Sequence, residues 1–332
     1  MVAHTLQPYQ QASERTAHWL LSHLEKDGSY GSTIQDLASY YKSPYLFYLS
    51  GRVEEASQLL TYIQRHFMRN NGDFVTADHL KSENPALAEY WAYMNGWLAL
   101  TAQKLGRFEV SYPAYQYLTT FYHPTLGGFI TQKPAAQTPP TVDVLSTAHL
   151  GLTALYFGDL DKAKRAGDLL QTFAALQPDS QQGFYLRLDN EGRLLTAFPP
   201  EASLFFTVSA VQPNQAYFMV GYPAAFLGKL YQATGHPPYL DTAKSYLEFA
   251  LSCRDHLRTC PWSHKVAWGA AIVAHLTRER RWAELAESIA DSLLSHQEAD
   301  GSWWPAQPAP TSFDQTAEIA IWLREITAEL ST

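Results

Sequence analysis

Four side chains that can move protons stand at the starts of apolar helical stretches: Asp143, His264, Asp314 and Glu318. A carboxyl group among aromatic rings has a raised pKa because burial disfavours its charged form, so Asp143 and Asp314 are candidate general acids. A helix N-terminus disfavours the cationic form of histidine, which makes His264 a candidate neutral base. The structural alternatives are an N-terminal cap for Asp143 and a surface loop position for His264.

Asp314 and Glu318 are four residues apart, so they share one face of the helix that we predict over 313–329. Two carboxyl groups on one face form a candidate acid/base pair. Alternatively, Asp314 caps this helix and Glu318 pairs with Arg324 or another neighbour. Glu318 lies in an otherwise apolar stretch, which calls for one of these explanations.

Aromatic residues make up 14% of the chain, which has 20 tyrosines and nine tryptophans. Such rings either fill a core or line a ligand pocket, and most of them are expected to be core. Residues near the predicted helix starts are the candidates for substrate contact. They are Tyr41, Tyr90, Trp91, His149, Tyr217, Lys265 and Trp268.

Cys253, His256, Cys260 and His264 form a run that suggests zinc, but their spacing matches no recognised ligand pattern. Two cysteines are too few for a disulfide framework, and both are expected to be small buried apolar residues. The sequence has no P-loop, dinucleotide glycine fingerprint, nucleophile elbow or H-E-x-x-H motif. We therefore expect an enzyme without a metal or cofactor.

A helix pair that repeats six times must position these residues. Each repeat has a loop with a Gly-x-aromatic step or a variant of it. The steps are Gly28-Ser29-Tyr30, Gly72-Asp73-Phe74, Gly127-Gly128-Phe129, Gly183-Phe184, Pro261-Trp262 in the fifth repeat, and Gly301-Ser302-Trp303. A single helix pair cannot bury its apolar face alone, so neighbouring pairs must cover it.

The first helix of each pair, helix A, is predicted to be amphipathic, and the second, helix B, to be apolar all round and buried. Helices A are expected near 8–26, 52–68, 107–121, 159–176, 238–254 and 281–297. Helices B are expected near 35–50, 87–105, 142–157, 214–234, 264–277 and 313–329.

The connections from B to A are short and carry a glycine at the C′ position: Gly51, Gly106, Gly158 and Gly235. The connections from A to B are long, and long loops on a rigid scaffold commonly carry function. The longest, 177–213, contains a β-hairpin pattern, with 184–188 and 194–196 on either side of Asp189-Asn190-Glu191-Gly192. The functional end is therefore expected where the B helices begin, with helix dipoles that favour an anionic group.

The segment from Gln297 to Trp303 matches the Q-x-x-x-G-x-W repeat of squalene cyclases. The whole arrangement resembles the (α/α)6 toroid of terpenoid cyclases, protein prenyltransferase β subunits and six-hairpin carbohydrate enzymes. This resemblance implies an all-α fold with one toroid domain over 1–332 and a central cavity. The chain lacks the D-x-D-D motif of squalene cyclases, and beyond Lys42 and Lys265 it has few basic residues for a diphosphate.

The net charge of -8, with 17% charged residues, argues against a nucleic-acid partner. The first 16 residues are polar and no apolar run is long enough to cross a bilayer, so we expect a soluble, cytoplasmic protein with a small-molecule substrate.

The first functional hypothesis is a cyclase or isomerase for an apolar, terpenoid-like or specialised metabolite. Asp143 or Asp314 would protonate the substrate, and His264 or a tyrosine would take the proton back. The alternatives are a carbohydrate enzyme (sugar 2-epimerase, uronyl hydrolase or lyase) and a non-catalytic binding protein. Many polar side chains at the site would favour the sugar, because sugars need many hydrogen bonds.

Overall fold

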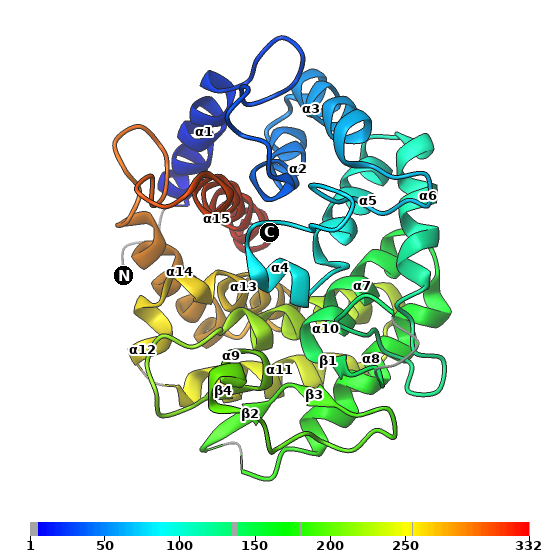
Figure 1. The fold of residues 1–332 in the computed structure, drawn as a ribbon. Helices are drawn as coiled ribbons and strands as arrows, with labels where there is room; N and C mark the ends of the chain where they lie inside the picture. Colours follow the sequence, from blue (N-terminus) through cyan, green and yellow to red (C-terminus); the bar gives the residue numbers. More distant parts are fainter. Residues whose placement is uncertain (1–5, 135–138, 180, 254, 332) are drawn as a thin grey trace. The chain divides into compact units, whose positions relative to one another are not determined.

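The computed structural model describes residues 6–134, 139–179, 181–253 and 255–331, which are mainly helical (Figure 1). The chain divides into two compact units, and each is described by itself. Unit 1 comprises Met1–Thr120 and Leu294–Thr327, and unit 2 comprises Phe121–Leu293 and Ala328–Thr332. None of the helices in the described ranges is long and apolar enough to cross a membrane.

The A helices bury one face each, as predicted. In α3 (Val53–Phe67) the buried residues Ala56, Leu59, Leu60 and Ile63 recur at spacings of three and four. The other A helices are α1 (Gln7–Ser22), α6 (Phe108–Thr119), α8 (Leu160–Ala175), α11 (Pro237–Ser252) and α14 (Arg280–Leu294). Their bounds lie within a few residues of the predicted ranges.

The B helices are buried far more completely. In α7 (Val144–Tyr156) every residue from Val144 to Ala154 is buried, and in α13 (His264–Thr277) so is every residue from His264 to Ala274. The other B helices are α2 (Ser43–Leu49), α5 (Tyr93–Lys104), α10 (Phe218–Thr234) and α15 (Ala309–Leu330).

Two B helices start later than predicted because a short helical turn precedes each. The turn η1 (Leu37–Ser39) comes before α2, whose first residues include Pro44, and α4 (Pro85–Glu89) comes before α5. Proline fits a first helical turn because the backbone N–H that it lacks has no partner there. The remaining short helices are η2 (Pro200–Ala202), α9 (Ser203–Phe206), α12 (Asp255–Thr259) and η3 (Pro261–Ser263).

Two small antiparallel sheets lie in unit 2. Strand β1 (Val142–Asp143) pairs with β3 (Arg187–Leu188), and β2 (Gly183–Tyr185) pairs with β4 (Thr207–Ser209). The predicted hairpin turn forms, with Leu188 opposite Leu194 as an isolated bridge. The strand at Phe184 pairs with β4 instead of with 194–196, so the end of the long loop folds back onto its beginning.

The Gly-x-aromatic steps form one recurring turn. After α3 the backbone amide of Arg69 donates to the carbonyl of Asp73, and the backbone amide of Gly72 donates to the carbonyl of Arg69. Equivalent pairs of hydrogen bonds follow α1 and α14. The glycines of these steps have positive φ angles and the aromatic rings are buried. The four steps concerned are Gly28 with Tyr30, Gly72 with Phe74, Gly127 with Phe129, and Gly301 with Trp303. Each turn thus ends an A helix and places one ring in the core.

Candidate functional site

The predicted site residues fall in both units, and each group is described within its own unit. Unit 1 holds Tyr41, Tyr90, Trp91, Asp314 and Glu318. Unit 2 holds Asp143, His149, Tyr217, His264, Lys265 and Trp268.

In unit 2, His149, Tyr222, His264 and Lys265 form a group that we call the histidine cluster, and none of them is more than 2% exposed. His264 Nδ1 lies 2.9 Å from the carbonyl oxygen of Pro261. A carbonyl only accepts, so Nδ1 carries the hydrogen and Nε2 has the lone pair. Lys265 Nζ lies 3.2 Å from this Nε2 and donates to it. The His264 ring is therefore neutral, and the Nε2 lone pair faces the Lys265 ammonium.

The second imidazole of the cluster is tied to Lys265 through Tyr222. His149 Nδ1 lies 2.6 Å from the Tyr222 hydroxyl. Lys265 Nζ lies 5.7 Å from the centre of the Tyr222 ring and 5.1 Å from that of Phe218. Two imidazoles, a phenol and an ammonium group are thus arranged in one contiguous series.

The contact between α10 and α13 explains why these groups meet. A Cβ on Gly221 in α10 would lie 2.3 Å from the backbone nitrogen of Val266, closer than atoms approach. A Cβ on Gly269 in α13 would lie 3.0 Å from the carbonyl oxygen of Gly221. Since neither glycine has a side chain, the two backbones approach closely, and Lys265 reaches Phe218 and Tyr222 on α10.

Asp143 caps α7 in the way that the structural alternative predicted. Its Oδ1 accepts a hydrogen bond of 2.5 Å from the backbone amide of Ser146. In the β1–β3 pair Asp143 lies opposite Arg187, which is 4% exposed and stacks 4.5 Å from the centre of the Phe206 ring. Arg187 was not among the predicted site residues. An arginine in the apolar stretch Tyr-Leu-Arg-Leu was a signal that could have identified it.

Of the other predicted residues in unit 2, Trp268 packs edge-on against Tyr222, with ring centres 5.6 Å apart. Tyr217 is fully buried with its hydroxyl 3.5 Å from the carbonyl oxygen of Gln212. Burial, and then the nearby thiols of Cys253 and Cys260, raise the pKa of Tyr217. This hydroxyl is therefore neutral at physiological pH.

The thiols of Cys253 and Cys260 lie 4.0 and 3.8 Å from the carbonyl oxygens of Ser209 and Gln215. Burial raises the pKa of the Cys253 thiol to about 12, so it is protonated at neutral pH. Across the described ranges, no three His, Cys, Asp or Glu residues gather in a way that could hold a metal ion.

In unit 1, Lys42, Asp314 and Glu318 form a group that we call the carboxylate cluster. Lys42 Nζ lies 2.6 Å from Asp314 Oδ1 and 2.5 Å from Glu318 Oε2, and the side chains are 2%, 10% and 3% exposed. A buried charge is tolerated only when it is paired in this way. The predicted carboxyl pair on one helix face is present, and a lysine from the first repeat bridges it.

Two of the structural alternatives are wrong, and the third, a pairing of Glu318 with another neighbour, is confirmed by Lys42. Helix α15 begins at Ala309, so Asp314 lies in its second turn and is not a cap. Arg324 pairs with Glu14 at 2.8 Å and not with Glu318. The sequence pattern could not identify Lys42 as the partner because the pairing joins the first and sixth repeats.

Aromatic rings surround the carboxylate cluster. Lys42 Nζ lies 5.0, 5.7 and 5.9 Å from the ring centres of Tyr41, Tyr93 and Trp97. The Tyr93 hydroxyl (3.4 Å) and the Trp322 indole nitrogen (3.1 Å) both donate to Glu318 Oε1. Burial, and then the negative charge of Asp314, raise the pKa of Tyr41 well above its ordinary value, so this phenol keeps its proton.

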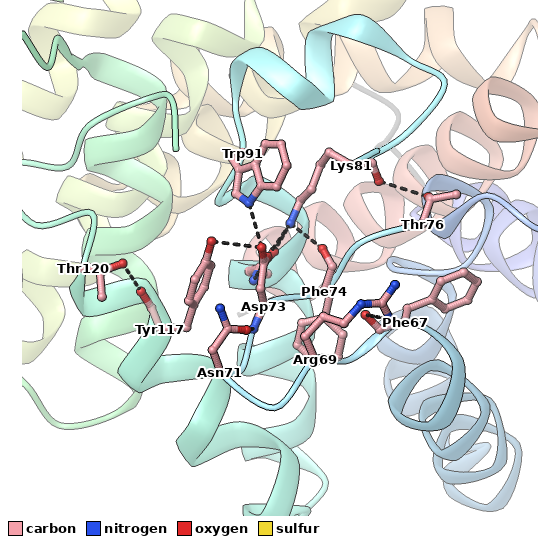
Figure 2. Close-up of polar contacts among 11 residues, drawn as sticks. Phe67, Arg69, Asn71, Asp73, Phe74, Thr76, Lys81, Trp91, Tyr117 and Thr120 are labelled. Atoms are coloured by element: carbon pink, nitrogen blue, oxygen red, sulfur yellow. Dashed lines mark hydrogen bonds and ion pairs between the residues drawn. The ribbon is translucent and has the colours of Figure 1, made fainter. Parts of the chain in front are cut away.

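A third polar group of unit 1 surrounds Asp73 (Figure 2). Asp73 Oδ1 accepts from Lys81 Nζ and from Asn95 Nδ2, both at 3.0 Å, and Oδ2 accepts from Trp91 Nε1 and the Tyr117 hydroxyl, both at 2.9 Å. Burial opposes ionisation, but Lys81 and these hydrogen bonds prevail and lower the pKa of Asp73. Four donors satisfy both carboxylate oxygens, so we interpret this group as a structural network.

The Asp73 network includes Trp91, one of two neighbouring predicted substrate contacts. The Trp91 indole N–H points at Asp73, while its ring lies 5.1 Å from Lys81 Nζ (Figure 2). Tyr90 ends α4, with its backbone amide bonded to the carbonyl of Ala86. The network was not predicted, although an aspartate between Gly72 and an aromatic residue, Phe74, is a signal in the sequence.

No protein-family model matches the sequence, and no curated protein matches it. Solved structures do match over nearly the whole chain. A D-mannose isomerase aligns over 97% of this chain and 98% of its own, with 13% identity and a TM-score of 0.70. A GH76 α-mannanase of Bacteroides thetaiotaomicron covers 96% of each chain, with 13% identity and a TM-score of 0.63.

The type II terpene cyclase MstE from Scytonema covers 98% of this chain and 100% of its own, with 13% identity and a TM-score of 0.59. All three are (α/α)6 toroid enzymes, and the chain has this all-α fold, as predicted from the repeat. Likeness at such low identity shows the fold alone. The chemistry must be argued from the side chains.

Proposed function

We propose that the protein is an acid/base isomerase or epimerase of a small, hydroxyl-rich carbonyl compound of the sugar class, acting at the histidine cluster. The observation that carries this proposal is the buried series His149, Tyr222, Lys265 and His264. It combines a neutral base, a cation and a phenol coupled to a second imidazole, the groups that moving a proton next to a carbonyl requires.

Each group has a role in an aldose–ketose type of step. Lys265 moves its N–H from His264 Nε2 to the carbonyl oxygen of the substrate, where the ammonium stabilises the negative charge that develops. The freed Nε2 of His264 removes the proton from the carbon next to the carbonyl. The Tyr222 hydroxyl, coupled to His149, donates a proton to that oxygen and receives one from the neighbouring hydroxyl. His264 then returns its proton to the former carbonyl carbon, so protons and charge balance.

The polar character of both clusters favours a sugar over the apolar substrate that was our first hypothesis. A terpenoid cyclase of the type considered needs a neutral carboxylic acid to protonate a hydrocarbon. Here Asp314 and Glu318 form ion pairs with Lys42, and Asp143 caps a helix. The likeness to a protein named D-mannose isomerase supports the same choice.

Hydrolysis of the mannanase type is less favoured. Two similar structures are described as variants of an α-1,6-mannanase that are inactive through replacement of two consecutive aspartates. This sequence has no two consecutive aspartates. Cyclisation of a terpenoid-like substrate remains the second candidate, because three aromatic rings lie within 5.9 Å of Lys42 Nζ and such faces stabilise cations.

The test is proton NMR of the purified protein in D₂O with a panel of aldoses, ketoses and N-acylated hexosamines, D-mannose and D-fructose included. Interconversion with solvent deuterium entering at the carbon next to the carbonyl is the expected result. A prenylated aromatic substrate, incubated in parallel, should remain unchanged. Cyclisation of that substrate, or no exchange with any sugar, would overturn the proposal, and sugar binding without exchange would indicate a binding protein.

A further inference from the structure

We propose that unit 2 contains a second ligand site, a pocket after the end of α13 that binds a phosphate group, carried by inorganic phosphate or by a phosphate monoester. The pocket has a volume of about 190 Å³, whereas one water molecule needs only about 10–15 Å³. Its charged and polar lining residues are His275, Arg278, Glu279, Arg280 and Glu329, all of them in unit 2. We call this site the basic pocket, and it has space for a ligand of several heavy atoms.

The basic pocket is remote from the histidine cluster. Helix α13 begins at His264 and ends at Thr277, so it has 14 residues and extends about 20 Å. The pocket is formed at the far end of this helix, by the turn from α13 to α14 and by the last residues of α15. A ligand there is therefore not the substrate of the histidine cluster, and the inference does not depend on the proposed function.

Arg278 is the observation that points to a ligand. Its φ of 61° lies in the left-handed region, which a residue with a Cβ adopts only with strain. Four other turns from a B helix to an A helix have a glycine at this position, with φ between 67 and 75°. Among the described residues, nothing forms a hydrogen bond or an ion pair with the Arg278 guanidinium, which is exposed at the pocket. The fifth repeat thus accepts backbone strain for a charge that no protein group uses.

Two glutamates also line the basic pocket, but other cations hold them. Lys244 Nζ lies 2.8 Å from one carboxylate oxygen of Glu279, and Arg281 Nε lies 3.0 Å from the other. Lys229 pairs with Glu329. None of these three cations is among the residues that line the pocket. The negative charges of the lining are therefore compensated from outside, and the charge of Arg278 remains for a ligand.

Arg280 supplies a second guanidinium to the basic pocket. It pairs with Glu284 at 2.7 Å, but the two side chains are 65% and 57% exposed, and surface pairs of this kind contribute little to stability. A guanidinium presents paired N–H donors that match two oxygens of a phosphate. Two guanidinium groups and the His275 ring offer more donors than one carboxylate group can accept, so the phosphate group fits best.

The experiment is isothermal titration calorimetry with inorganic phosphate at an ionic strength of about 10 mM, where surface charges are weakly screened. We expect Arg278→Gln to weaken phosphate binding about tenfold. The matched control is Arg65→Gln, because Arg65 in α3 is also exposed and has no partner among the described residues. It removes the same charge away from the pocket and should keep the affinity within about twofold.

Two further measurements sharpen the test. Arg278→Gly restores the glycine of the other four repeats, so it should abolish phosphate binding and raise the melting temperature in buffer without phosphate. Titration with glycerol 3-phosphate distinguishes the two sources of the phosphate group. Tighter binding than that of inorganic phosphate assigns the site to a monoester, and weaker binding assigns it to the free ion.

The inference fails if the unmodified protein binds no phosphate, if chloride at the same concentration binds equally well, or if Arg278→Gln and Arg65→Gln have equal effects. Each of these results would show that Arg278 is only a surface charge. If phosphate binds in an Arg278-dependent way while no sugar is isomerised, the inference holds and the proposed function fails.

Discussion

The two units each bury a lysine at the start of a B helix, but the lysines have different neighbours. Lys42 in unit 1 contacts two carboxylates at 2.6 and 2.5 Å. Lys265 in unit 2 contacts the lone pair of the neutral His264 imidazole at 3.2 Å. Aromatic rings lie within 6 Å of both ammonium groups. The helix positions and the packing are thus alike, and the chemistry of the partners differs.

The difference between the partners suits the two lysines to different tasks, holding a fixed charge and transferring a proton. Carboxylates in an ion pair keep their charge, so the carboxylate cluster presents fixed acceptors. An imidazole gains and loses a proton near neutral pH, so the histidine cluster suits proton transfer. Under the proposed function, catalysis would belong to the histidine cluster, and the carboxylate cluster would hold fixed charges.

The largest effect on stability should come from removing the positive charge of Lys42. Lys42→Met leaves two buried carboxylates without their cation, so we expect a loss of about 3–5 kcal/mol in the free energy of unfolding, measured with urea at pH 7. The control is Lys229→Met, because the Lys229–Glu329 pair is more exposed, at 20% and 10%. An equal or larger loss for the control would mean that the buried ion pairs of the carboxylate cluster stabilise the fold no more than a more exposed pair does.

Removing the base should affect the rate and spare the fold. We expect His264→Gln to lower kcat for the sugar substrate about 10²–10³-fold, with a melting temperature close to that of the parent. His236→Gln is the control, because His236 is exposed and meets the Tyr239 ring edge-on, and it should leave kcat unchanged. If His264→Gln retains full kcat, proton transfer does not belong to the histidine cluster and the contrast between the two lysines is lost.

The sequence predicted those features that depend on nearby residues. The A and B helices follow from the spacing of apolar residues, and the C′ glycines Gly51, Gly106, Gly158 and Gly235 all have the positive φ that this position needs. The cap by Asp143 was also foreseeable, because its partner Ser146 is only three residues away.

Partners that are distant in the sequence were not predictable. Lys42 and Glu318 are 276 positions apart, and His149 and Tyr222 are 73 apart. No periodicity within one helix specifies which face of another helix it meets. The sequence therefore indicated which residues could act, while the packing of helices such as α10 on α13 decided which of them are neighbours.

A third buried lysine, Lys81, can be compared with Lys42 and Lys265, because we interpret its role as structural. Lys81 pairs with Asp73, whose oxygens are all satisfied by protein donors. The folded-state pKa of Asp73 lies below the ordinary 3.8, so its contribution is present above pH 3.8 and is lost as the pH falls through the folded value. Asp73→Asn should therefore cost about 2 kcal/mol of unfolding free energy at pH 7, and the difference should vanish in acid.

The measurement for Asp73 is urea unfolding of both proteins from pH 7 down to about pH 2. Asp189→Asn serves as the control, because the pKa of Asp189 is also lowered, by hydrogen bonds from Arg193, but this carboxylate lies at the surface. The control should show little change at any pH. A difference for Asp73→Asn that does not depend on pH would contradict the role of its charge.

The smallest effect on stability is expected for Trp91, and it should show whether this residue contacts the substrate or belongs only to the Asp73 network. Trp91→Phe removes one of the two donors to Asp73 Oδ2, and Tyr117→Phe removes the other. If Trp91 acts only in the network, each variant loses about 1 kcal/mol of unfolding free energy and keeps kcat/KM within about twofold. If Trp91 contacts the substrate, as the sequence analysis predicted, its variant alone raises the KM. Trp91 would then have a role beyond its hydrogen bond to Asp73.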